Sequence, residues 1–143
     1  MREVISHKIE VHVAGICIHD NKVLIAKRSP NRKLYPSLWE CGGGQVEAGE
    51  SFEEAVIRQI REEFSAIVKP IKVLGTYEIS KSDLEQKKIP GIKFVCRIEG
   101  FVNGTEPIIS DEHTEWRWQP VEKLNEVEYI PGVVEDIRLV IDA

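Results

Sequence analysis

Acidic side chains recur at close spacing between Glu50 and Glu63. Glu62 and Glu63 are adjacent, and Arg58 lies four residues before Glu62. Like charges three or four residues apart on a helix repel each other, so a carboxylate cluster favours a compensating cation. Carboxylates are ligands of Mg²⁺, which commonly bridges them to phosphate oxygens. The segment therefore predicts a site for a divalent cation and a phosphorylated small molecule. A solvated acidic face with an Arg58–Glu62 ion pair is the plainer interpretation.

A run of three glycines, Gly42 to Gly44, leads toward this acidic segment. Glycine has no Cβ, so such a run lets the backbone approach a ligand closely or turn without a clash. A glycine loop alone is weak support for a binding site. At this fixed distance from the carboxylates, however, it favours the cation site over the solvated face.

A helix is predicted from about Phe52 to Phe64, where apolar residues recur every four positions. Ser51 with Glu54 three residues later has the spacing of a capping box, which marks the helix start. At about 100° per helical residue, Gln59, Glu62 and Glu63 fall in one arc beside the apolar stripe. The helix therefore presents its acidic residues together.

The remaining elements follow from hydrophobic periodicity. Strands are predicted at residues 8–18, 23–26, 38–41, 67–79, 92–102 and 115–119, and further helices at 121–124 and 133–141. Turn residues at 19–22 join the first two strands into a hairpin, and a polar segment separates residues 80 and 91. Strands between helices indicate an α/β fold with a mixed sheet covered by helices.

Composition narrows the functional class. A chain of 143 residues, 42% hydrophobic and 30% charged, fits a single domain over residues 1–143. A net charge of -5 argues against nucleic acid as a partner. No apolar run approaches the roughly 20 residues of a membrane span, and Met1 starts no signal-peptide pattern, so a cytoplasmic protein is expected. Cys17, Cys41 and Cys96 form no metal-binding pair and are predicted to be buried, reduced thiols.

The segment from Gly44 to Ala66 resembles the Nudix box, Gly-x5-Glu-x7-Arg-Glu-U-x-Glu-Glu-x-Gly-U, where U is aliphatic. Seven of the nine defined positions match without a gap over 23 residues. The resemblance implies the Nudix α/β/α sandwich with a central mixed β-sheet. It also implies a pyrophosphohydrolase that uses Mg²⁺, or Mn²⁺ in its place, to cleave a phosphoanhydride bond in a nucleoside-diphosphate-linked or nucleoside triphosphate substrate.

The resemblance also implies roles for individual residues. Glu62 and Glu63 correspond to metal ligands, and the Gly43 carbonyl lies where the family often adds a backbone ligand. Arg58 corresponds to the arginine that orients the catalytic carboxylates, and Glu50 to a position of milder importance. Outside the box, many members add an acid from the loop before a late Trp-containing strand. Our candidate for that catalytic and metal-binding acid is Glu112, with Asp111 and Glu115 as alternatives; each of the three taken alone is equally well explained as a solvated surface charge.

Two positions depart from the family pattern. Gln59 replaces the first Glu of the Arg-Glu pair, and an amide cannot accept a proton at neutral pH. Either another acid such as Glu112 or Glu115 serves as the base, or the chain is a catalytically weak nucleotide-binding or sensor module. Ser65 replaces the last Gly, which costs on the order of 1 kcal/mol if the helix ends in a left-handed conformation.

The expected partner is a small nucleotide substrate, and homodimer formation is left open. A basic loop precedes the glycines, and its Arg28 and Lys33 are candidates to hold phosphates. A solvated basic loop is the simpler interpretation of these cations. Trp39 and Gly44 complete the predicted substrate contacts, although Trp39 could equally pack in the core. Other aromatic residues able to stack on a base are Tyr35, Phe94 and Trp116, although core packing is the simpler role for Phe94.

Overall fold

The computed structural model describes residues 10–80 and 88–142, and it begins with an antiparallel hairpin. Strand β1 (His12–His19) pairs with β2 (Lys22–Arg28), and His19 lies opposite Lys22. The two turn residues, Asp20 at φ 51° and Asn21 at φ 59°, both have positive φ. This is the turn geometry that matches the twist of a two-residue hairpin, and Asp and Asn tolerate it. The predicted hairpin is confirmed.

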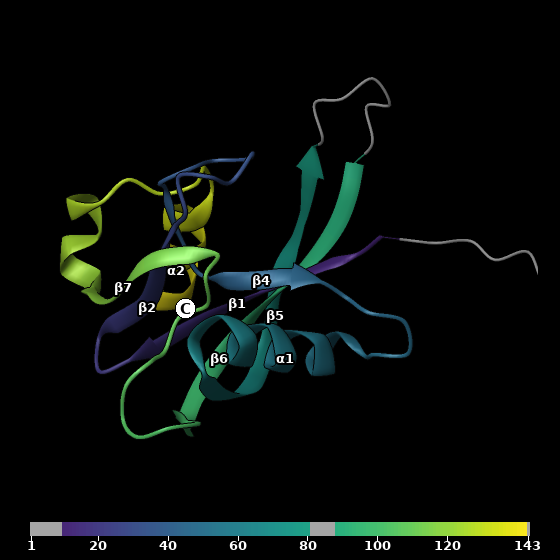
Figure 1. Cartoon of the computed structure of the whole chain (residues 1–143), viewed down its shortest axis with the longest axis horizontal. Helices are drawn as coiled ribbons and strands as arrows, with labels where there is room; N and C mark the ends of the chain where they lie inside the picture. Colours follow the sequence, from purple (N-terminus) through teal and green to yellow (C-terminus); the bar gives the residue numbers. More distant parts are fainter. Residues whose placement is uncertain (1–9, 81–87, 143) are drawn as a thin grey trace, which may run out of the picture.

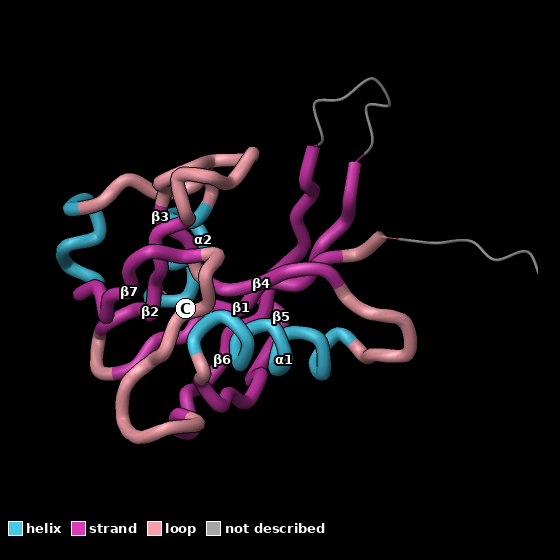
Figure 2. Tube along the Cα trace, in the orientation of Figure 1, coloured by secondary structure: helices cyan, strands magenta, loops and turns pink. Residues whose placement is uncertain are grey.

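The described residues contain a seven-stranded mixed sheet with the order β3-β2-β1-β6-β5 (Figure 1). The other strands are β3 (Trp39–Glu40), β4 (Gly42–Gln45), β5 (Ala66–Ser80), β6 (Lys88–Phe101) and β7 (His113–Pro120). Strand β1 is parallel to β6, while β4 adds to β1 and β7 adds to β2 in the antiparallel sense. Strands β5 and β6 continue beyond the rest of the sheet as a projecting pair (Figure 2).

Alternate residues of the central strands enter two separate cores. On β2, Leu24 and Ala26 join the core beneath helix α1 (Phe52–Phe64), whereas Val23 and Ile25 join the core beneath helix α2 (Val133–Ile141). Burial on both faces explains why β2 reads as a continuous apolar run. The predicted α/β/α sandwich with a central mixed sheet is confirmed (Figure 1).

Helix α1 has the predicted bounds and both predicted ends. The Ser51 hydroxyl accepts a hydrogen bond from the Glu54 backbone, and the Glu54 carboxylate accepts one from the Ser51 backbone. At the other end Ser65 adopts φ 53°, the left-handed conformation that glycine usually supplies. Its hydroxyl donates to the Ile108 carbonyl at 3.1 Å, a tertiary contact that glycine could not make.

Long-range pairing changes several predicted boundaries. Strand β6 begins at Lys88 rather than residue 92, because Ile89 pairs with Ile79 on β5. Strand β1 begins at His12, and residues 8 and 9 of its predicted start lie outside the described residues, as does the polar segment 81–87. The predicted helix at 121–124 is a 3₁₀ helix, η1 (Val121–Glu126).

The three thiols are free, as predicted, with Cys17 and Cys96 buried and Cys41 partly buried. Neither α1 nor α2 is long and apolar enough to span a bilayer.

Candidate metal and phosphate site

The outer edge of β4 faces helix α1 and carries the backbone groups of the candidate site. The Gly43 N–H donates to Glu63 Oε2 at 2.9 Å. Two residues on, the Gln45 carbonyl accepts from Arg58 Nη2 at 2.9 Å and from Gln59 Nε2 at 3.2 Å. Alternate residues of an antiparallel strand turn both N–H and C=O away from the partner strand. The Gly43 carbonyl therefore also points away from β1, on the edge that faces α1.

The glycines allow this close approach between β4 and its neighbours. A Cβ on Gly43 would lie closer than 3.0 Å to the backbone oxygen of Val13, and one on Gly42 would meet Ile60 equally closely. A Cβ on Gly44 would instead meet the flexible end of the Gln59 side chain. Only the Gly43 position is closed by backbone, which cannot rotate away.

Glu63 is the buried carboxylate of the site, with 6% of its surface exposed. Burial raises the pKa of Glu63 well above its usual range, and the nearby charges of Glu40 and Glu112 raise it further. The hydrogen bond from Gly43 and the charge of Arg32 oppose this rise in the pKa. Such a carboxylate is poorly compensated by the protein, and a bound cation would complete its environment.

Arg58 gathers the more exposed acids. Its guanidinium donates to both oxygens of Glu50, at 2.6 and 2.9 Å, and reaches Glu62 at 3.3 Å and Glu47 at 3.6 Å. The bond from Arg58, followed by the Glu47 N–H, lowers the pKa of Glu50 to about 2. Glu62 is 59% exposed and held more weakly, so its carboxylate is free to turn toward a ligand.

The basic loop before the glycines is tied to two acids. Arg28 donates to Glu40 at 2.8 Å and to the Leu34 carbonyl at 3.0 Å, and only 12% of its side chain is exposed. Arg32 pairs with Glu112 at 3.2 Å. Lys33 is exposed and has no ion pair within residues 10–80 and 88–142. The Arg28 guanidinium is therefore held by Glu40 and Leu34, whereas the Lys33 side chain is accessible.

Sequence reasoning did not single out Glu40, yet Glu40 lies within this cluster. Its Oε2 accepts from Arg28 and lies 3.0 Å from His113 Nε2. The sequence did contain one indication that Glu40 belongs to the site. Glu40 lies two residues before Gly42, and in extended chain the side chains of residues two apart point to the same side. A Cβ on Gly42 would lie 2.8 Å from Glu63 Oε2, so this side of the chain faces the candidate site.

The predicted aromatic contacts divide into buried and open rings. Trp39 is 4% exposed, and the Arg117 guanidinium lies 5.0 Å from its ring centroid. Phe94 is also buried, so neither offers a face to a base. Tyr35 is exposed, and Trp116 lines a cavity of about 580 Å³.

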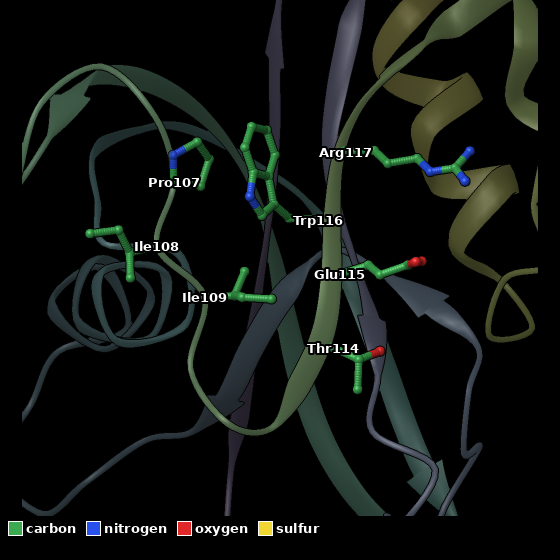
Figure 3. A pocket seen from close by; sticks show the side chains of 7 residues that line it. All are labelled: Pro107, Ile108, Ile109, Thr114, Glu115, Trp116 and Arg117. Atoms are coloured by element: carbon green, nitrogen blue, oxygen red, sulfur yellow. The ribbon is translucent and has the colours of Figure 1, made fainter.

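Figure 3 shows this cavity between the segment 107–109 and strand β7. Pro107 and Ile109 face Trp116 across it, while Glu115 and Arg117 project from the other side of β7. Trp116 packs against the core beneath α1. Glu115 therefore points away from the α1 face that carries Glu63, whereas Glu112 lies near Glu63 in the preceding turn.

The donor set consists of carboxylate and carbonyl oxygens. In the part of the chain that the structure describes, no three His, Cys, Asp or Glu side chains converge closely enough to enclose a metal. Mg²⁺ usually keeps several waters and takes one or two carboxylates plus substrate phosphates. The buried Glu63, the outward Gly43 carbonyl and the exposed Glu62 fit a partly hydrated ion of this kind.

A sequence profile of the NUDIX domain matches residues 9–139. The chain belongs to the Nudix family. Over 86 residues it is 37% identical to the ADP-ribose pyrophosphatase of Methanocaldococcus jannaschii. This match covers 57% of this chain and 50% of that protein. Over 51 residues it is 47% identical to the nucleoside triphosphatase NudI of Salmonella arizonae, or 36% of each chain. The chain thus matches half or less of the length of these Nudix relatives.

Solved Nudix structures agree with the fold over nearly the whole chain. The MutT protein from Methanosarcina mazei Go1 superposes with a TM-score of 0.72 at 25% identity, covering 97% of this chain and 98% of that one. A NUDIX hydrolase from Nitrosomonas europaea has a TM-score of 0.76 at 19% identity, covering 94% and 90%. The second likeness concerns the fold alone.

Proposed function

We propose that this Nudix protein is a divalent-cation-dependent hydrolase that cleaves a phosphoanhydride bond in a nucleoside-diphosphate-linked or nucleoside triphosphate substrate. The observation that carries the proposal is the buried Glu63 carboxylate against the outward backbone edge of Gly43. The pyrophosphatase and triphosphatase names of the two relatives support the same bond type.

In this proposal Glu63, Glu62 and the Gly43 carbonyl hold the cation, and Glu112 joins them when Arg32 releases it. A bound Mg²⁺ would polarise the phosphoanhydride and lower the pKa of a water molecule. Arg58 keeps Glu62 at the edge of the site by its 3.3 Å contact. Glu112, at 52% exposure, is the acid best situated to take a proton from an attacking water.

The substrate would lie between the basic loop and the cavity beside β7. Lys33 and Arg32 are the accessible cations for terminal phosphates, and Trp116 offers a ring face for a base in the 580 Å³ cavity. Arg28 and Trp39 are not part of this proposal, because one is bound to Glu40 and the other is in the core. Gly44 keeps the backbone free of a Cβ beside Gln59.

A second candidate function rests on Gln59. Its amide donates to the Gln45 carbonyl, so it fastens α1 to β4 and cannot act as a base. If no other acid takes the proton, the chain would bind a nucleotide and turn it over poorly. A glutamate at position 59 would present only acceptors to the Gln45 carbonyl, so its carboxylate would be driven off that contact and toward the site.

One experiment separates the two functions. Nucleoside triphosphates, nucleoside-diphosphate sugars and ADP-ribose are incubated with Mg²⁺ or Mn²⁺, and phosphate and pyrophosphate release are measured against the double variant Glu62→Gln/Glu63→Gln. Turnover of at least one substrate above this control supports the hydrolase. If none is turned over, the hydrolase is excluded. Tight calorimetric binding without turnover, with hydrolysis gained by Gln59→Glu, would support the binding module.

A further inference from the structure

Glu40 and His113 are 73 residues apart in sequence and meet at the end of the candidate site. Glu40 Oε2 and His113 Nε2 are 3.0 Å apart, and the same carboxylate oxygen accepts from Arg28 at 2.8 Å. A carboxylate can only accept, so the His113 ring carries a proton on Nε2. The acid thereby determines the orientation of the ring.

The His113 ring is fixed on its other sides as well. Its side chain is 1% exposed, and its plane stacks on Phe64, the last residue of α1, with centroids 6.2 Å apart and an angle of 22°. Backbone bonds join the same turn to the site: His113 N–H donates to the Ser110 carbonyl, and Ser110 N–H donates to the Glu63 carbonyl. Glu112 lies within this turn, directly before His113.

Two polar atoms of this turn are buried without a partner among the described residues. They are His113 Nδ1 and the Ser110 hydroxyl. In a neutral ring with its proton on Nε2, Nδ1 is an acceptor, and a hydroxyl can donate. With Nε2 held by Glu40, the ring keeps Nδ1 buried.

We propose that Glu40 and His113 are a positioning pair for Glu112: Glu40 orients the His113 ring, and the ring holds the turn so that the Glu112 carboxylate lies near Glu63. This inference rests on the proposed role of Glu112 at a divalent-cation site. Stability alone does not explain the arrangement, because replacing buried charged pairs with apolar residues is often neutral or stabilising. Outer partners that orient metal ligands, in contrast, typically change metal affinity about 10–100-fold when they are removed.

The experiment is a double-mutant cycle read by calorimetric titration of the full chain with Mn²⁺ alone. His113→Phe keeps a ring against Phe64 but removes the Nε2–H donor, and Glu112→Gln removes the carboxylate that is positioned. We expect His113→Phe to weaken Mn²⁺ binding about 10-fold in the wild-type background and less than about twofold in the Glu112→Gln background. His113→Gln, which restores an N–H donor of similar reach, should bind Mn²⁺ within about twofold of wild type.

Gln119→Leu is the matched control. Gln119 is also a buried polar residue of β7, and its Nε2 donates to the Lys123 carbonyl at 2.7 Å and to Glu126 at 2.9 Å, away from the turn. It should reduce stability and leave Mn²⁺ affinity unchanged. An equal loss of affinity in this control would overturn the positioning role.

The remaining outcomes are also decisive. Unchanged Mn²⁺ affinity in His113→Phe, or an equal loss with and without the Glu112 carboxylate, would overturn the inference while leaving the hydrolase proposal intact. If circular dichroism shows that His113→Phe is unfolded, Glu40→Met, which keeps a side chain of similar length and removes the acceptor for His113 Nε2, is carried through the same cycle under the same criteria. Absence of saturable Mn²⁺ binding and of turnover in the wild type would instead remove the proposed function, and the positioning role with it.

Discussion

Adjacent glycines at the candidate site should respond very differently to the same added methyl group. In Gly43→Ala the new Cβ meets the backbone oxygen of Val13, a fully buried residue of β1. In Gly44→Ala it meets only the end of the Gln59 side chain. We therefore expect Gly43→Ala to force β4 away from β1 and Gly44→Ala to displace one amide.

The expected free energies follow from these contacts. Overpacking against groups that cannot rotate away costs about 1–3 kcal/mol, and we expect the upper end for Gly43→Ala because the obstacle is backbone. For Gly44→Ala, loss of the Gln59 hydrogen bond costs about 0.5–1.5 kcal/mol, offset by about 0.5–1 kcal/mol from replacing glycine in a strand. A 143-residue chain loses about 1 °C of Tm per 0.3 kcal/mol. Gly43→Ala should thus lower the Tm by about 10 °C and Gly44→Ala by less than about 3 °C.

Differential scanning calorimetry and urea unfolding would measure both variants, with Gly75→Ala as the matched control. Gly75 also lies in a strand, and a Cβ there would meet nothing within 4 Å. If the Gly43→Ala protein melts within a few degrees of Gly75→Ala, the close packing of Gly43 on β4 against the Val13 backbone of β1 is refuted. The same conclusion would follow if Gly44→Ala lost as much stability as Gly43→Ala.

Two further predictions concern the ionisation of the site acids. Because burial raises the pKa of Glu63, the stability that its protonated form contributes is complete below the unfolded pKa and is lost as the pH rises through the folded value. In EDTA, Glu63→Gln should therefore be more stable than wild type at pH 8, with a smaller difference at pH 5; urea unfolding showing the reverse trend would contradict the burial argument. For Glu50 the dependence of stability on pH has the opposite sign, because Arg58 lowers its pKa to about 2. The stabilisation by the Glu50 carboxylate is present above about pH 4.5 and is lost toward pH 2. Glu50→Gln should flatten the fall in stability over that acid range, and an acid limb as steep as that of wild type would show that the Arg58 pair adds nothing to the folded state.

Local features were predictable because they depend on neighbouring residues. Helix α1 could be bounded at Phe52 and Phe64 from its apolar period and its capping box. The hairpin turn at Asp20 and Asn21 depends on the same kind of short-range chemistry. The acidic cluster and the family resemblance lie within this local range too, since a helix brings together residues three and four apart.

Burial was predictable for some residues, such as Cys17, Cys96 and Phe94, but not for those of the site. Trp39 was predicted either to contact a substrate or to pack in the core, and it lies in the core; of the adjacent acids Glu62 and Glu63, one is exposed and the other buried. Helical spacing places both acids beside the apolar stripe, and only the position of β4 decides which of them it covers. The start of β6 at Lys88 likewise depends on pairing with β5 rather than on its own polar sequence.

The sequence by itself determined the family, helix α1 and the chemical type of the site: carboxylates beside a glycine-rich backbone. The tertiary structure decided which of those groups are buried and which residues they contact. It placed Glu63 against the Gly43 N–H and brought Glu40 to His113 across 73 residues of chain. Periodicity and capping are properties of a few consecutive residues, whereas burial and long-range ion pairs depend on which strands become neighbours, and that is settled only when both cores form.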